Sequence, residues 1–167
     1  MNAQRLWNAR VIDPETGVVI ENGTVAWADG LLTDVSEARG DAPEGAVDLE
    51  GKAVLPGLID AHVHLISDLE RSPGFGPSPQ LHGEDTPPRE LGWELVRTAE
   101  GGLGSMDALA AATSGGSAAL GLPERGRLAA GAAADIVVVD GDPLAGPRVL
   151  LRPQRIWLVI RDGEGVA

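Results

Sequence analysis

The sequence predicts a mixed α+β fold, in which strands from the two ends of the chain form a small β-sandwich around a short helical insert. Short β-rich runs separated by turn residues fill the first third and the last quarter of the chain. The middle is rich in Ala and Leu and carries helix-capping residues. Strands at both ends need partners, and pairing with each other closes one sheet layer or sandwich with the middle inserted.

In the N-terminal part we expect strands over residues 5–12, 18–21, 24–28 and 31–35. The dipeptides Asn22-Gly23 and Asp29-Gly30 separate the last three, and Asn-Gly between β-rich runs is a strong signal for a tight hairpin. A further hairpin is expected around Glu50-Gly51, between residues 47–49 and 52–55. The alternating residues 58–65 predict a strand that enters a different layer.

Helices are expected in the second half of the insert. Thr86 and Pro87 are suited to begin the first helix, and Gly101-Gly102 to end it. Its apolar face would consist of Leu91, Leu95, Val96 and Ala99.

A second helix is expected from a cap at Ser105 to about residue 113, with Ser114-Gly115-Gly116 interrupting it before a short turn at 117–120. Residues 135–140 and 156–160 then predict two further strands.

Charge and composition exclude several classes of function. The formal net charge of −12 argues against binding to nucleic acid or to anionic membrane surfaces, because both attract basic patches. The absence of cysteine excludes disulfides, thiolate metal sites and cysteine nucleophiles. No run is long and apolar enough for a membrane helix or a signal peptide, so a cytoplasmic protein is the expectation.

The chemistry of the chain centres on His62 and His64. Two histidines at i and i+2 on a strand point to the same side and can bind one divalent ion, usually Zn²⁺. Asp60 could orient one of these ligands through a hydrogen bond without binding the metal itself. The alternative is a pair of solvated strand histidines. His82 is a candidate third ligand, but it is also read as an exposed loop residue.

The flanks of this pair resemble a known family. Residues 55–65, LPGLIDAHVHL, resemble the first barrel strand of the amidohydrolase superfamily of metal-dependent hydrolases. Residues 111–122 resemble the helix after that family's last barrel strand, and residues 126–131 and 134–143 resemble the return into its β-sandwich. The form HVHL is most similar to the branch of imidazolonepropionase and prolidase-like enzymes.

This resemblance implies a hydrolase of carbon–nitrogen bonds, with His62 and His64 as metal ligands. The family also uses a lysine or glutamate, two further histidines and an aspartate that shuttles protons. Here the only lysine, Lys52, precedes the histidine pair, and no histidine follows His82. Asp85, close to Glu84, is a loose counterpart of the aspartate.

The space between the two matching ends is too short for a full TIM barrel. About 70 residues lie there, whereas an eight-fold βα barrel takes roughly 200–250. We therefore expect a composite β-sandwich domain from residues 1–57 and 126–167, and a barrel remnant in residues 58–125. Substrate specificity is left open, because the loops that decide it follow barrel strands.

Three hypotheses follow. In the first, the chain is a reduced metal-dependent hydrolase. In the second, it is a non-catalytic remnant of an internal deletion, which associates with itself or with a full-length relative because its barrel strand would otherwise be an exposed edge. In the third, the barrel is missing through a gene-boundary error.

Overall fold

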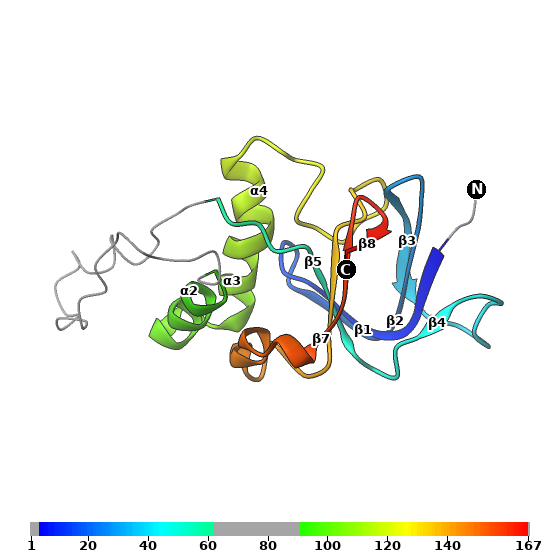
Figure 1. Cartoon of the computed structure of the whole chain (residues 1–167), viewed down its shortest axis with the longest axis horizontal. Coiled ribbons are helices and arrows are strands. Elements are labelled where there is room, and N and C mark those ends of the chain that lie inside the picture. The colour runs from blue at the N-terminus through cyan, green and yellow to red at the C-terminus, as the bar shows by residue number, and fades with distance from the viewer. Residues whose placement is uncertain (1–3, 62–90, 167) are drawn as a thin grey trace, which may run out of the picture.

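The computed structural model describes residues 4–61 and 91–166 of the chain. Its strands all belong to one mixed sheet of eight strands (Figure 1). In chain order they are β1 (Gln4–Asp13), β2 (Val18–Ala28), β3 (Leu31–Glu37), β4 (Val47–Asp48), β5 (Ala53–Pro56), β6 (Ile136–Val139), β7 (Ile156–Arg161) and β8 (Glu164–Gly165).

The sheet joins the two ends of the chain through β5. Its strand order is β3-β2-β1-β5-β6-β7-β8, with β4 paired to β1 beside β5. β5 runs parallel to β1, with Arg10 opposite Ala53, and antiparallel to β6, with Val54 opposite Val138. The prediction that N-terminal and C-terminal strands share a sheet is therefore confirmed.

The sheet curls until its two ends meet. The residues before β6 run along the free edge of β3, where the Leu32 N–H donates to the Ala132 carbonyl at 2.8 Å. The turn between β7 and β8 then reaches the turn between β2 and β3, and the Trp27 Nε1–H donates to the Gly163 carbonyl at 2.9 Å. Figure 1 shows β8 beside β3 at this end of the molecule. Since all strands are hydrogen-bonded into one sheet, the structure confirms a mixed fold but does not confirm a sandwich of two sheets.

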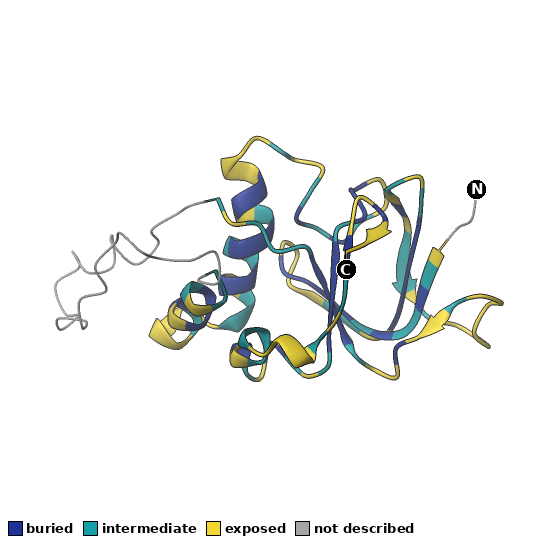
Figure 2. Ribbon diagram, in the orientation of Figure 1, coloured by how far each residue is buried: buried dark blue, intermediate teal, exposed yellow. Residues whose placement is uncertain are grey.

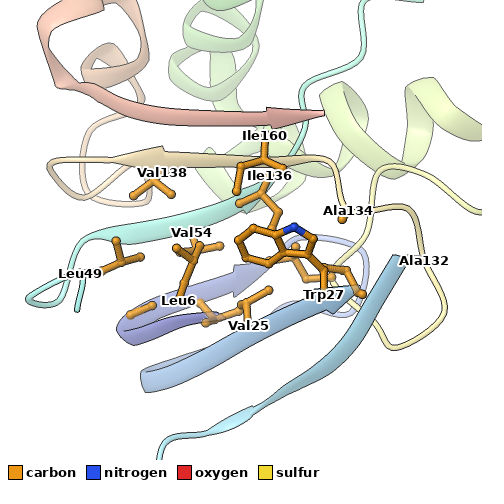
Figure 3. Close-up of a cluster of buried hydrophobic side chains, with 14 residues drawn as sticks. Leu6, Val25, Trp27, Leu49, Val54, Ala132, Ala134, Ile136, Val138 and Ile160 are labelled. Atoms are coloured by element: carbon orange, nitrogen blue, oxygen red, sulfur yellow. The ribbon is translucent and has the colours of Figure 1, made fainter. Parts of the chain in front are cut away.

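A first hydrophobic core fills the inside of the curled sheet. Trp27 points from β2 toward Ile136 and Ile160, on β6 and β7 (Figure 3). Leu6 and Val25 pack in the same cluster, and both are almost completely buried. Aliphatic side chains and one tryptophan thus make this core, as expected for a chain with few aromatic residues.

A second core lies between the other face of the sheet and the helices. The regular helices are α2 (Leu91–Thr98), α3 (Ser105–Ala110) and α4 (Gly116–Ala119). Leu95 and Leu109 from α2 and α3 pack with Ile12, Leu55 and Val137 from the sheet. Figure 2 shows the buried residues concentrated in the sheet and along the helices that cover it. In the described part of the chain, no helix has the length and apolar character needed to cross a bilayer.

The predicted hairpin at Asn22-Gly23 is wrong. β2 continues through both residues, and Gly23 pairs with Ala9 on one side and Glu37 on the other. A Cβ atom on Gly23 would lie 2.5 Å from Val11 Cγ2, so glycine serves the close approach of two strands next to a bulge in β1. The Asp29-Gly30 turn is confirmed, with φ of 52° and 79°.

The predicted hairpin around Glu50-Gly51 is also wrong. β4 and β5 do not pair with each other, and each lies parallel to β1. Glu50 and Gly51 have φ of 51° and 80°, and the Gly51 N–H donates to the Asn8 carbonyl at 2.8 Å. The left-handed pair therefore shifts the chain along one edge of β1 instead of reversing it.

The helix beginning at Ser105 is not interrupted at Ser114-Gly115-Gly116. α3 passes through a π-helical segment, residues 111–115, into α4, and the backbone at Gly115 and Gly116 stays right-handed. Its N-cap residue is Gly104 and not Ser105. The predicted break at Gly101-Gly102 is confirmed by the φ of 117° at Gly102, while the predicted start at Thr86 and Pro87 lies outside the described residues.

An ion pair joins β1 to the loop after β6. Arg10 Nη1 lies 2.6 Å from Asp142 Oδ2, and the Leu144 N–H donates to Asp142 Oδ1 at 2.8 Å. Burial opposes ionisation of the Asp142 carboxyl, but the hydrogen bonds from Arg10 and the loop amides outweigh it and lower the pKa below the ordinary value of 3.8. The folded state therefore favours the ionised carboxylate.

Stability should depend on pH through Asp142. A lowered pKa stabilises the folded state above the ordinary pKa of 3.8, and this contribution is lost as the pH falls through the lower folded value. D142N should therefore be less stable than the wild type at neutral pH, and the difference should narrow below the ordinary carboxyl pKa. Urea unfolding of both proteins over a pH series measures this, and a difference that is the same at every pH would contradict it.

Candidate functional site

The chain leaves the sheet after β5 toward the predicted metal-binding motif. The Gly57 N–H donates to the Asp135 carbonyl, and the Ile59 N–H donates to the Ala112 carbonyl, both at 2.8 Å. Residues 58–61 belong to no strand, so the predicted strand 58–65 is wrong in its described part, and a hydrogen bond holds this segment against a helix instead. These two hydrogen bonds hold the segment that leads to Asp60 and Ala61.

The helix accepts this chain through its π-helical segment. The Gly116 N–H donates to the carbonyls of Ala111 and Thr113, which leaves the Ala112 carbonyl available for Ile59. A Cβ atom on Gly116 would lie only 2.8 Å from the Ile59 carbonyl oxygen. The glycine therefore permits the close approach that a larger residue would block.

A network of ion pairs holds Asp135, whose carbonyl accepts the hydrogen bond from Gly57. Arg125 Nη1 pairs with Asp135 Oδ2 and Arg125 Nη2 with Asp162 Oδ1, while the Asp162 N–H donates to Asp135 Oδ1 at 2.8 Å. Hydrogen bonds to Asp162 and Asp135 raise the pKa of Arg125 above its ordinary value. The start of the segment that leads to Asp60 is thus hydrogen-bonded to a residue that ion pairs hold beside the ends of β6 and β7.

A small cavity lies beside Asp60. It has about 30 Å³, enough for a single water molecule, and its polar lining comes from Asp60, Glu94 and Thr98. Asp60 is exposed and Glu94 is half-buried, whereas Thr98 is buried and its Oγ1 has no hydrogen-bond partner among the described residues. Two carboxylates and a hydroxyl therefore meet where the chain approaches His62.

The other predicted site residues cannot be placed. His62, His64, His82, Glu84 and Asp85 lie outside the described residues, so their roles stay predictions. Within residues 4–61 and 91–166, no three His, Asp or Glu side chains gather as a metal would require. Of the predicted site residues the structure thus describes Asp60, and Glu94 lines the same small cavity.

Glu94 and Thr98 were missed by the sequence prediction. They share one face of α2 with Leu91 and Leu95, at the spacing i, i+3, i+4 and i+7. Two polar residues on an otherwise apolar stripe could have signalled a polar contact at the helix–sheet boundary. Because most residues of that face are apolar, the sequence predicted only core packing for it.

Residues 74–167 match the sequence model of the amidohydrolase family. The chain belongs to the amidohydrolase family. This confirms the family predicted from the motif at residues 55–65 and from the C-terminal matches.

Curated relatives of this amidohydrolase-family chain are much longer than the part that matches. Imidazolonepropionase from Bacteroides thetaiotaomicron is 35% identical over 97 residues, which cover 47% of this chain and 22% of that protein. Dihydroorotase from Citrifermentans bemidjiense is 46% identical over 68 residues, which cover 40% of this chain and 14% of that protein. The chain therefore spans less than a quarter of either relative.

Solved structures show a similar fold. A prolidase complexed with N-methylphosphonate-L-proline aligns over 99% of both chains, with a TM-score of 0.68 and 14% identity. A Xaa-Pro dipeptidase with bound methionine aligns over 99% of this chain and 100% of that one, with a TM-score of 0.68 and 10% identity. At these identities the similarity concerns the fold alone.

Proposed function

We propose that this chain derives from metal-dependent hydrolases of carbon–nitrogen bonds and retains part of their metal site, with reduced or no catalysis as an isolated chain. The observation that supports the proposal is the anchored segment 57–61, which leads from β5 along the helix to Asp60 and Ala61, the first two residues of the motif Asp60-Ala61-His62-Val63-His64. Relatives named imidazolonepropionase, dihydroorotase and 5'-deoxyadenosine deaminase agree with this class.

The donor set suits a divalent metal. His62 and His64 would supply two imidazole nitrogens, the preferred donors of zinc alongside thiolates and carboxylates, with His82 as the candidate third ligand. A bound metal of this kind lowers the pKa of water and polarises a carbonyl group. Asp60 and Glu94, which line the same small cavity, would orient ligands through hydrogen bonds, and Asp85 would move a proton.

The alternative is a non-catalytic module, and the shared second core favours it. Leu95 and Leu109 lie in one hydrophobic cluster with Ile12 and Leu55, so the described helices of the proposed barrel remnant share a core with the sheet. Such a unit would fold without a full barrel, and it would form a homo-oligomer through the exposed barrel remnant. Light scattering at micromolar concentration tests this, with a dimer or larger species expected and a clean monomer contradicting it.

Zinc binding separates the two proposals. Protein purified without a histidine tag and loaded with Zn²⁺ should retain about one equivalent after dialysis, because three protein ligands suffice for a stable site. H62A and H64A should each weaken binding by more than roughly 100-fold, since even residues that only orient ligands change affinity by about 10–100-fold. Elemental analysis by mass spectrometry measures the retained zinc.

D60N serves as the graded control, with an expected loss of about tenfold. Hydrolysis assays with dihydroorotate, an imidazolone propionate and a Xaa-Pro dipeptide then test for residual activity. A wild-type protein that retains no zinc would overturn the metal-site proposal, and the non-catalytic module would then be the remaining proposal.

A further inference from the structure

A groove opens on the inner side of the curled sheet, at the end of the β1–β2 hairpin. Its volume is about 420 Å³, within the range of roughly 300–1,000 Å³ typical of small-molecule sites. Most of its lining is aliphatic, from Val11, Val18, Ile20, Val35 and Leu128. Among the described residues, this groove shares no lining residue with the small cavity beside Asp60.

Asp13 is the unusual residue of this groove. Along β1, Val11 packs in the first core and Ile12 in the second, so strand alternation turns Asp13 to the side of Val11. Asp13 is only 8% exposed. A carboxylate in such a position is costly unless its oxygens are paired.

Among the described residues, one oxygen of Asp13 has a hydrogen-bond partner and the other has none. The Thr16 hydroxyl donates to Asp13 Oδ2 at 2.8 Å, which closes the turn between β1 and β2. Asp13 Oδ1 is buried and has no hydrogen-bond partner among the described residues. The turn thus explains one oxygen and leaves the other buried and unpaired in a residue that lines the groove.

The charge of the groove favours a cation. Asp34 also lines it, and Asp34 Oδ2 lies 2.9 Å from Arg5 Nη1, so that carboxylate already has a positive partner. No Lys or Arg is among the residues that line the groove in the described part of the chain. Of the two carboxylates that line the groove, Asp13 is therefore the one without a basic partner among the described residues, and it lies beside aliphatic side chains.

We propose that this groove binds an organic ammonium ion with a short aliphatic body. The ammonium group donates to Asp13 Oδ1, and the body lies along Val11, Ile20 and Leu128. Residues 15–17 of the turn are exposed, so a small shift of this turn gives the ammonium access to the buried oxygen. Pairing removes the cost of an orphaned buried oxygen and supplies a charge-assisted hydrogen bond.

The test uses n-hexylammonium as the probe and 1-hexanol as its neutral counterpart. In a titration followed by ¹H–¹⁵N NMR, hexylammonium should shift the amides of Thr16, Val18 and Ala129 saturably, with a Kd on the order of 1 mM. Hexanol should bind at least about tenfold more weakly, because it cannot form a charge-assisted hydrogen bond. Equal binding of both probes, or shifts confined to other regions, would overturn the proposal.

Two variants complete the test. D13N keeps an oxygen for Thr16 but removes the charge, and it should weaken hexylammonium binding about tenfold or more. The matched control E15Q removes the same charge from an exposed residue of the same turn and should leave the Kd unchanged.

A129W covers the case in which D13N fails to fold. Ala129 lines the groove, and its carbonyl accepts the Ala132 N–H, a bond that the substitution preserves. The indole should fill the groove and abolish the shifts. Wild-type affinity in either D13N or A129W would overturn the proposal.

Discussion

Replacing Leu109 with Ala should lower the free energy of unfolding by about 3 kcal/mol, in the middle of the range for Leu→Ala in a packed core. Leu109 lies on α3, is completely buried, and packs in the second core, between the helices and the sheet. Truncation would leave a cavity that neither the sheet nor the helix can close without moving. Urea unfolding followed by circular dichroism measures the loss.

Leu120→Ala is the matched control. Leu120 follows α4 and is 52% exposed, so its truncation should change the free energy of unfolding by no more than about 0.5 kcal/mol. L109A should also unfold in a single transition, because residues of the sheet and of the helices share this core. If L109A cost no more than L120A, or if the helices melted before the sheet, the helices would not be an integral part of the domain.

The sequence predicted the strands well because their signals are local. The β-rich runs that became β1, β3, β6 and β7 carry their pattern in consecutive residues, and Asp29-Gly30 forms its turn from backbone preferences alone. The two failed hairpins depended on contacts that are distant in sequence. Gly23 packs closely against Val11, and Gly51 donates a hydrogen bond to Asn8. Neither contact can be predicted from the dipeptide itself.

The helix after Ser105 shows the same limit. Ser114-Gly115-Gly116 has the composition of a break, and only the packing of Ile59 against Gly116 reveals why small residues stand inside a helix. The family was predictable because its motif, residues 55–65, is a contiguous stretch. Glu94 and Thr98 line the same cavity as Asp60 only because α2 packs beside residues 59–61. No sequence pattern near the histidines therefore indicates that these two residues lie close to Asp60.

The return from the helices into the sheet depends on a second glycine of this kind, Gly126. Gly126 has a φ of 71°, and a Cβ atom there would lie 2.5 Å from the Thr113 carbonyl oxygen and 2.9 Å from the Ser114 nitrogen. Both neighbours are backbone atoms of the π-helical segment, so no side chain can rotate away to make room. Any residue other than glycine must therefore push the loop away from the helix.

G126A should destabilise the protein by about 3 kcal/mol, from a left-handed backbone penalty of about 1–2 kcal/mol and a packing conflict of similar size. Gly121 provides the matched control, since it has a φ of 70° and an added Cβ would meet nothing within 4 Å. G121A should cost only the backbone penalty, about 1 kcal/mol. Thermal unfolding of both variants separates the two contributions, because an equal loss in both would mean that the contact between Gly126 and the helix contributes nothing. A larger loss in G126A would instead show that the π-helical segment, which also holds Ile59 through the Ala112 carbonyl, depends on the loop that follows it.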